Sequence, residues 1–159
     1  MQNLDTIFKA ISPNKFYCNI FQDLFFLETT AFLQSSFQSQ IFEAHGITLG
    51  ETLKQISRQD NSHFMLLGKA ITLLGGKPEL KSLKGQYFSG KHITYTTNAF
   101  EIVLEDITLK ENMVIAYKTN ISKLQNQNLK NLLQQILVQE EYHLEFLKNV
   151  IKNFKTQSK

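Results

Sequence analysis

The sequence is poor in residues that interrupt helices and in residues that cross-link a chain. Its 159 residues include one cysteine, two prolines, seven glycines and no tryptophan. A single cysteine, Cys18, cannot form an intramolecular disulfide, so we expect a reducing compartment and a small buried thiol. Pro13 and Pro78 both lie near the ends of predicted elements, which leaves the element interiors free of helix breakers. This composition favours an all-α fold.

Long apolar runs and clusters of basic residues are also missing. No run approaches the ~18 apolar residues that a membrane span needs, and no segment resembles a signal peptide, so a cytoplasmic location without a membrane partner is expected. The net charge is +3, but the lysines are scattered and form no stripe that could follow phosphates, which argues against nucleic-acid binding. With 42% hydrophobic and 19% charged residues, the chain is expected to form a single globular domain over 1–159.

Apolar residues recur at three- and four-residue spacing over most of the chain, which predicts helices with one apolar face. The four predicted helices, with the bundle core at about 13–155, cover about 13–45, 49–74, 97–121 and 122–155. Ser12 and Pro13 predict a cap and first turn for the first of them. Residues 1–11 could form a short additional helix. Residues 79–96 show no sustained period and predict a connection too long for a turn between neighbouring helices.

Two of these helices carry an acid and a histidine three residues apart on the face that should be apolar. In the last helix Glu140 and His143 interrupt a stripe of leucines and isoleucines, and in the second helix Asp60 and His63 have the same spacing. Residues at i and i+3 project from one face, so each pair can reach one ion. A buried carboxylate needs a partner, a proton or a metal. The alternatives are a buried hydrogen-bonded pair for Glu140 and His143 and a surface pair for Asp60 and His63.

The first and third helices can add one inward acid each, Glu28 and Glu105. For Glu28, a surface glutamate is nearly as common an outcome. Glu105 competes with other acids of an uncertain helix phase, namely Glu101, Asp106 and Glu111. Six such ligands would hold two ions, and a carboxylate-rich set with only two histidines suits iron or manganese better than zinc.

Four other residues receive simpler interpretations. His45 and His92 are expected to be exposed rather than to bind metal. Tyr117 and Tyr142 lie on helices near the predicted site and could hydrogen-bond a ligand carboxylate, but a packing role is favoured for both.

This arrangement resembles the ferritin-like di-iron carboxylate superfamily, which includes the bacterioferritins and rubrerythrins. In that superfamily the first and third helices each give one Glu, and the second and fourth each give Glu-x-x-His. The corresponding residues here are Glu28, Asp60, His63, Glu105, Glu140 and His143, within a similarity that covers about 15–155. The resemblance implies an antiparallel four-helix bundle with a long crossover at 79–96 and a short N-terminal helix packed outside it.

The resemblance also implies a chemistry. It predicts two iron ions per chain, or manganese or a mixed pair, that react with dioxygen or hydrogen peroxide in iron handling or oxidant removal, with no catalytic residues beyond the metal ligands. Asn61 stands where haem-binding bacterioferritins carry a Met ligand, so no haem is expected. The absence of Cys-x-x-Cys predicts an external electron donor, and a homodimer or larger homo-oligomer is implied. Asp60 is one methylene shorter than the family's Glu, which keeps open a structural or interaction module with a degenerate metal site.

Overall fold

Long helices form most of the described chain. The computed structural model describes residues 8 and 11–157, and the helix predicted at 1–11 lies outside the described residues apart from positions 8 and 11. The elements within the described ranges are α2 Lys15–Ala44, α3 Leu49–Leu73, the short 3₁₀ helix η1 Gly90–His92, α4 Ala99–Lys123 and α5 Gln127–Gln157. None of the helices described is long and apolar enough to cross a lipid bilayer.

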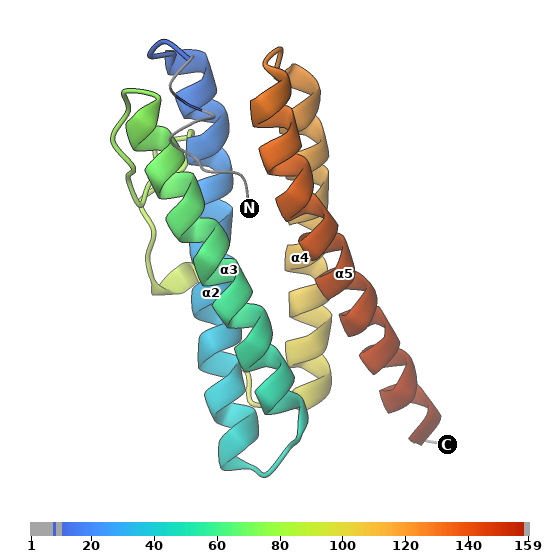
Figure 1. Cartoon of the computed structure of the whole chain (residues 1–159). Coiled ribbons are helices and arrows are strands. Elements are labelled where there is room, and N and C mark those ends of the chain that lie inside the picture. Colours follow the sequence, from blue (N-terminus) through green and yellow to red (C-terminus); the bar gives the residue numbers. More distant parts are fainter. Residues whose placement is uncertain (1–7, 9–10, 158–159) are drawn as a thin grey trace.

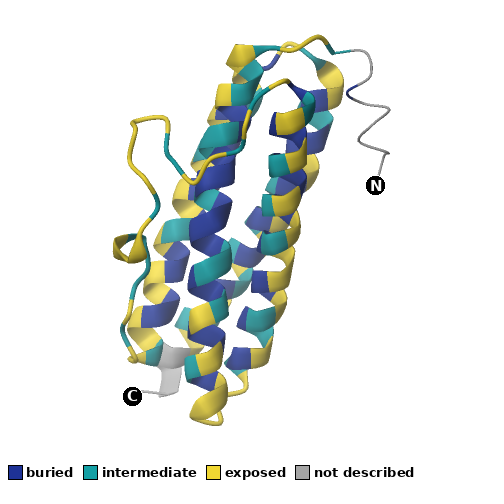
Figure 2. Cartoon of the chain, turned by 90° about the vertical axis from the view of Figure 1, so that its left-hand side faces the viewer, coloured by how far each residue is buried: buried dark blue, intermediate teal, exposed yellow. Residues whose placement is uncertain are grey.

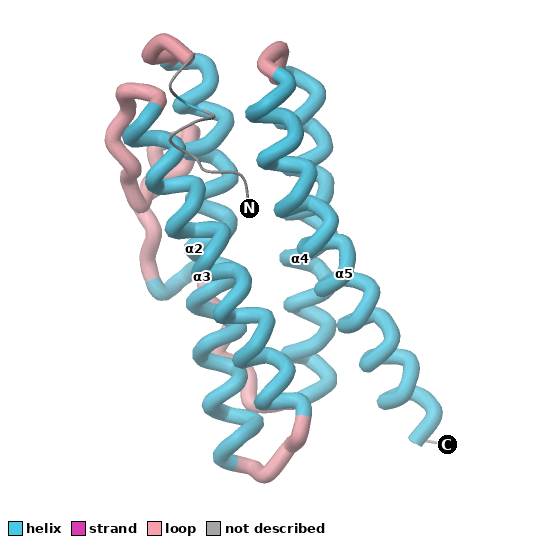
Figure 3. Tube along the Cα trace, in the orientation of Figure 1, coloured by secondary structure: helices cyan, strands magenta, loops and turns pink. Residues whose placement is uncertain are grey.

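The chain reverses direction between α2 and α3, and again between α4 and α5 (Figure 1). Between these two hairpins a long connection runs back along the outside of the first pair, so that α4 starts at the same end of the bundle as α3 (Figure 3). This topology confirms the predicted all-α antiparallel four-helix bundle with a long crossover between its second and third helices.

Asparagine side chains cap three of the helices, with Asn14 before α2, Asn98 before α4 and Asn126 before α5. Asn14 has an extended backbone, and its side-chain oxygen accepts from the backbone N–H of Tyr17 at 3.0 Å. The predicted cap at Ser12 is therefore wrong by two residues, because Asn14 supplies the oxygen that the first free N–H groups need. Asn98 caps α4 in the same way. Gly46, at φ 67°, lies in the turn that follows α2.

Two glutamines of α2 hold the long connection in place. The side-chain amide of Gln22 donates to the backbone oxygen of Lys81 at 3.0 Å, and its oxygen accepts from the backbone N–H of Glu79 at 3.1 Å. Further along, the side-chain oxygen of Gln34 accepts from the backbone N–H of Thr94 at 3.3 Å. The connection is thus attached to α2 at both of its ends.

The buried residues line the inner faces of the helices (Figure 2) and form two apolar clusters. One cluster includes Phe21, Leu67, Met113 and Leu133. The other includes Phe42, Leu53, Ile102 and Leu147. On α3 and α5 the stretch of sequence between the two clusters contributes a buried acid and a buried histidine, and α2 adds the buried acid Glu28. The apolar clusters therefore enclose a polar layer in the middle of the bundle.

Candidate metal centre

The polar layer contains three carboxylates, two imidazoles and one ammonium group, contributed by all four helices. They belong to Glu28 of α2, Asp60 and His63 of α3, Lys110 of α4, and Glu140 and His143 of α5. None of these residues is more than 3% exposed. The charges are therefore held out of water, where each requires a partner of opposite sign.

Four of these residues can share one cation. Glu28, Asp60, His63 and Glu140 each offer one ligand atom, and these four atoms lie within 4.8 Å of one another. Nδ1 of His63 lies 3.0 Å from Oε1 of Glu140 and 3.5 Å from Oε1 of Glu28. We call this group the His63 half of the centre.

The other half is built around His143 and differs in composition. Nδ1 of His143 lies 3.5 Å from Oδ1 of Asp60 and 3.7 Å from Oε1 of Glu140. Here the additional charged group is Lys110, whose Nζ donates to Oδ1 of Asp60 at 2.8 Å and to Oε2 of Glu140 at 2.7 Å. A cationic side chain thus lies between the two acids of the acid-x-x-His pairs.

The structure brings together five of the six predicted ligands, and the expectation for Glu105 is wrong. Glu105 is exposed on α4, whereas Ile102, Asp106 and Lys110 of the same helix are buried. Asp106 is buried outside the cluster, where its Oδ1 accepts from the side-chain amide of Gln34 at 2.7 Å. The physical reason is helix phase, because Glu105 lies about 100° around the helix from Asp106 and so faces water.

Tyr117 also belongs to the centre, contrary to the packing role favoured from sequence. This buried tyrosine of α4 donates its hydroxyl proton to Oε1 of Glu28 at 2.5 Å. Burial and the Glu28 carboxylate raise the pKa of the phenol well above its usual value, so it stays a neutral donor. Tyr142, in contrast, is 70% exposed.

Two glutamines that the sequence interpretation missed fix the orientation of both imidazoles. Nε2 of His63 bonds to Oε1 of Gln139 at 2.8 Å, and Nε2 of His143 bonds to Oε1 of Gln59 at 2.5 Å. A carboxamide oxygen only accepts, so each Nε2 carries a proton, and in the neutral imidazole, the form that binds a metal, the lone pair of Nδ1 faces inward. The signal was present in the sequence, because a Gln precedes the acid in both pairs.

Burial and neighbouring charges shift the pKa values within the metal-free cluster. Burial raises the pKa of Asp60 to about 7 against the opposing charge of Lys110, and it raises the pKa of Glu28 together with the charge of Glu140. Burial alone would lower the pKa of His63, but the neighbouring carboxylates raise it to about 10. Burial likewise opposes ionisation of Lys110 and Glu140, yet their ion pair raises the pKa of the lysine and holds that of the glutamate well below its usual range.

Several donor atoms of the centre lack hydrogen-bond partners within the protein and are of the types that bind a metal ion. With both imidazoles neutral, five buried atoms of the centre have no hydrogen-bond partner among the described residues: Oε2 of Glu28, Oδ2 of Asp60, Nδ1 of His63, Oε1 of Glu140 and Nδ1 of His143. Carboxylate oxygens and imidazole nitrogens form the donor set that iron and manganese bind. One ion fits the His63 half. A second ion at His143 would share its carboxylates with the ammonium of Lys110.

A pocket of about 270 Å³ leads to the His63 half from the surface. It lies between α3 and α5, and its lining includes Gln59, His63, Gln135 and Gln139. The pocket therefore reaches His63 and its glutamine partner.

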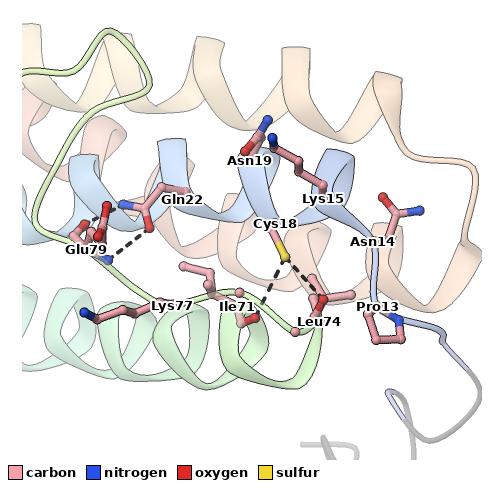
Figure 4. Close-up of a pocket in the computed structure, with 12 residues that line it drawn as sticks. Pro13, Asn14, Lys15, Cys18, Asn19, Gln22, Ile71, Leu74, Lys77 and Glu79 are labelled. Atoms are coloured by element: carbon pink, nitrogen blue, oxygen red, sulfur yellow. Dashed lines mark hydrogen bonds between the residues drawn. The ribbon is translucent and has the colours of Figure 1, made fainter.

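A second pocket, of about 480 Å³, lies near the start of α2 and contains Cys18 (Figure 4). The Sγ of Cys18 points toward the backbone oxygen of Leu74, 3.4 Å away. Burial raises the pKa of the Cys18 thiol, which makes it a weaker nucleophile. This half-buried thiol lies apart from the metal ligands and adds nothing to the centre.

The two remaining histidines lie elsewhere in the fold. His45 is exposed, as predicted, and its Nδ1 lies 2.8 Å from the backbone oxygen of Ile41. His92, which was also expected to be exposed, is half-buried because its ring packs against Phe26 and Phe88. Neither residue contributes to the polar layer.

A ferritin-like four-helix bundle with carboxylate and histidine donors at its middle is the class of protein that this fold and site define. The family model described as Rubrerythrin matches residues 20–151, a range that includes every residue of the cluster. The chain belongs to the rubrerythrin family, which confirms the resemblance seen in the sequence. A comparison with curated proteins found no match.

Proposed function

We propose that the protein binds a redox-active metal ion, iron or manganese, at the His63 half of the centre and reacts there with hydrogen peroxide or dioxygen. The observation that carries the proposal is the convergence of unpartnered, fully buried carboxylate and imidazole atoms from three helices. Such atoms are costly in a protein interior unless a cation compensates them. Membership of the rubrerythrin family supports the same chemistry.

Each residue of the His63 half has a distinct task in this proposal. Glu28, Asp60 and Glu140 supply negative oxygens, and His63 supplies a neutral nitrogen that Gln139 holds in the required orientation. Tyr117 occupies one oxygen of Glu28 and leaves the other for the ion. A bound iron or manganese ion supplies the change of oxidation state that peroxide or dioxygen reduction requires.

The electrons must come from outside the chain. Reduction of hydrogen peroxide to water consumes two electrons and two protons, and a single cysteine cannot form the Cys-x-x-Cys pairs of an internal iron relay. An external reductant is therefore part of the proposal. We also propose that the chain forms a homodimer or larger homo-oligomer and that it is cytoplasmic. Light scattering on the purified chain tests the self-association.

Anaerobic metal loading followed by oxidant tests the proposal. The chain is loaded with Fe²⁺, freed of excess metal, analysed for iron, and then mixed with hydrogen peroxide or with dioxygen while its ferric absorption is followed. Retained iron that oxidises faster than iron in buffer supports the function, and the faster oxidant identifies the substrate. His63→Gln should lose the iron. Glu145→Gln, an exposed change on the same helix as Glu140, is the matched control and should retain it.

A metal-free structural or interaction module is the second candidate, and one observation favours it. Lys110 already places a cation between Asp60 and Glu140, and a protonated His63 would add another beside Glu28 and Glu140. Such a network compensates the buried carboxylates without metal. A chain that retains no iron or manganese after loading, and that keeps its stability in the presence of a chelator, would support this candidate over the first.

A further inference from the structure

Lys110 points its ammonium group into the metal centre. The residue is 2% exposed, and its Nζ lies 2.8 Å from Oδ1 of Asp60 and 2.7 Å from Oε2 of Glu140. We propose that this ammonium takes the place of the second cation of a two-ion site, so that the centre binds a single metal ion, in its His63 half. The inference rests on the proposed metal-binding function and specifies its stoichiometry.

The two halves of the centre are alike except at this position. Each has an imidazole whose Nε2 bonds to a glutamine of the opposite helix, and both border Asp60 and Glu140. The His63 half has a further carboxylate, that of Glu28. The His143 half has Lys110 instead, because the acid expected from α4, Glu105, is exposed.

The oxygens available to a second ion are correspondingly few. Lys110 already binds Oδ1 of Asp60 and Oε2 of Glu140, so one oxygen of each carboxylate remains for metal. A single ion in the His63 half can use both of these oxygens together with Glu28 and His63. A second ion would have His143 as its one unshared donor and an ammonium group as a neighbour.

Charge balance favours the same stoichiometry. Glu28, Asp60 and Glu140 supply three negative charges, and the ammonium of Lys110 with one divalent ion supplies three positive ones. A second divalent ion would leave a net charge of plus two in the protein interior, where uncompensated charge is strongly unfavourable. Replacing Lys110 with glutamate would give four carboxylates, which balance two divalent ions.

Manganese titration of the full chain tests the inference. Mn²⁺ is added to the metal-free wild type, to Lys110→Glu and to Lys110→Met, and bound metal per chain is measured along with the electron paramagnetic resonance spectrum. The matched control is Lys118→Met, on the same helix, whose lysine is exposed and pairs with Glu141 at the surface. Circular dichroism checks that each variant is folded.

We expect one Mn²⁺ per chain for the wild type and for Lys118→Met, with the hyperfine pattern of an isolated ion. Lys110→Glu should bind two ions and lose that pattern through coupling between them. Two ions in the wild type would overturn the inference while leaving the metal-binding function intact. No ion in the wild type would overturn both, and the wild-type measurement decides this even if a Lys110 variant fails to fold.

Discussion

His63 of α3 donates its Nε2 proton to the side-chain oxygen of Gln139 of α5, 2.8 Å away. The bond joins the two hairpins of the bundle beside the metal centre. It also turns the lone pair of Nδ1 toward the carboxylates of Glu28 and Glu140. The reciprocal bond from His143 to Gln59 gives the centre an approximate twofold arrangement.

Gln139→Leu should weaken metal binding by roughly 10–100-fold, because the imidazole of His63 loses the acceptor that fixes its tautomer and ring orientation. The dissociation constant for Mn²⁺, measured by titration, checks this. Gln59→Leu should have a smaller effect, since His143 lies in the half that holds Lys110. Gln135→Leu is the control, because Gln135 also lines the pocket between α3 and α5. Equal losses for Gln139→Leu and Gln59→Leu would argue against an ion confined to the His63 half.

Tyr117→Phe should lower the free energy of unfolding of the metal-free chain by about 1–3 kcal/mol, because a fully buried oxygen of Glu28 loses its donor. Urea denaturation in the presence of a chelator measures the change. Tyr142→Phe removes a hydroxyl that is mainly in water, since Tyr142 is 70% exposed, and should change the stability by less than about 0.5 kcal/mol. Equal effects of the two substitutions would mean that the hydroxyl of Tyr117 adds nothing to stability and that the residue contributes through packing alone.

The fold and the two acid-x-x-His pairs were predictable because their signal repeats over many turns of helix. Glu140 and His143 lie within a long stripe of leucines and isoleucines, so their inward direction follows from helix period alone. The short spacing within each pair then places both side chains on one face. An error of a residue or two at the helix ends, as at Ser12, leaves this result unchanged.

The third helix could not be read in the same way, because apolar residues occupy two overlapping faces of it. Glu105 and Asp106 are neighbours, and a small error in phase exchanges the buried acid for the exposed one. Lysine side chains are normally exposed to solvent, so the residue type of Lys110 did not indicate that it is buried. It does stand four residues after Asp106 and seven before Tyr117, which is the period of a buried stripe.

Asp106 should make the stability of the chain depend on pH. Burial raises the pKa of this carboxyl from 3.8 to about 6, with the bond from Gln34 opposing the rise. A carboxyl that holds its proton more tightly in the folded state stabilises the fold below its unfolded pKa. That contribution is lost as the pH rises through about 6.

Asp106→Asn keeps an acceptor oxygen for Gln34 but does not titrate. Between about pH 4 and about pH 7.5 the free energy of unfolding of the wild type should therefore fall relative to that of the variant by on the order of 2–3 kcal/mol. Urea denaturation at several pH values measures both curves, and groups common to both chains cancel in their difference. Parallel curves would show that the Asp106 carboxyl titrates alike in the folded and unfolded states.

Glu28→Gln should affect stability differently with and without metal. In the metal-free chain it removes a buried charge that burial and Glu140 disfavour, while it keeps an oxygen for the hydroxyl of Tyr117, so stability should stay equal or rise. With Mn²⁺ at a hundred times its dissociation constant, the wild type should gain about 2.7 kcal/mol. The variant should gain far less, because a carboxamide is a poor ligand for the ion. Thermal melts with and without Mn²⁺ measure both effects, and Glu145→Gln, exposed on α5, should behave as the wild type. An equal gain in Glu28→Gln would mean that the ion does not use Glu28, since the loss of its charge would then leave the bound ion unaffected.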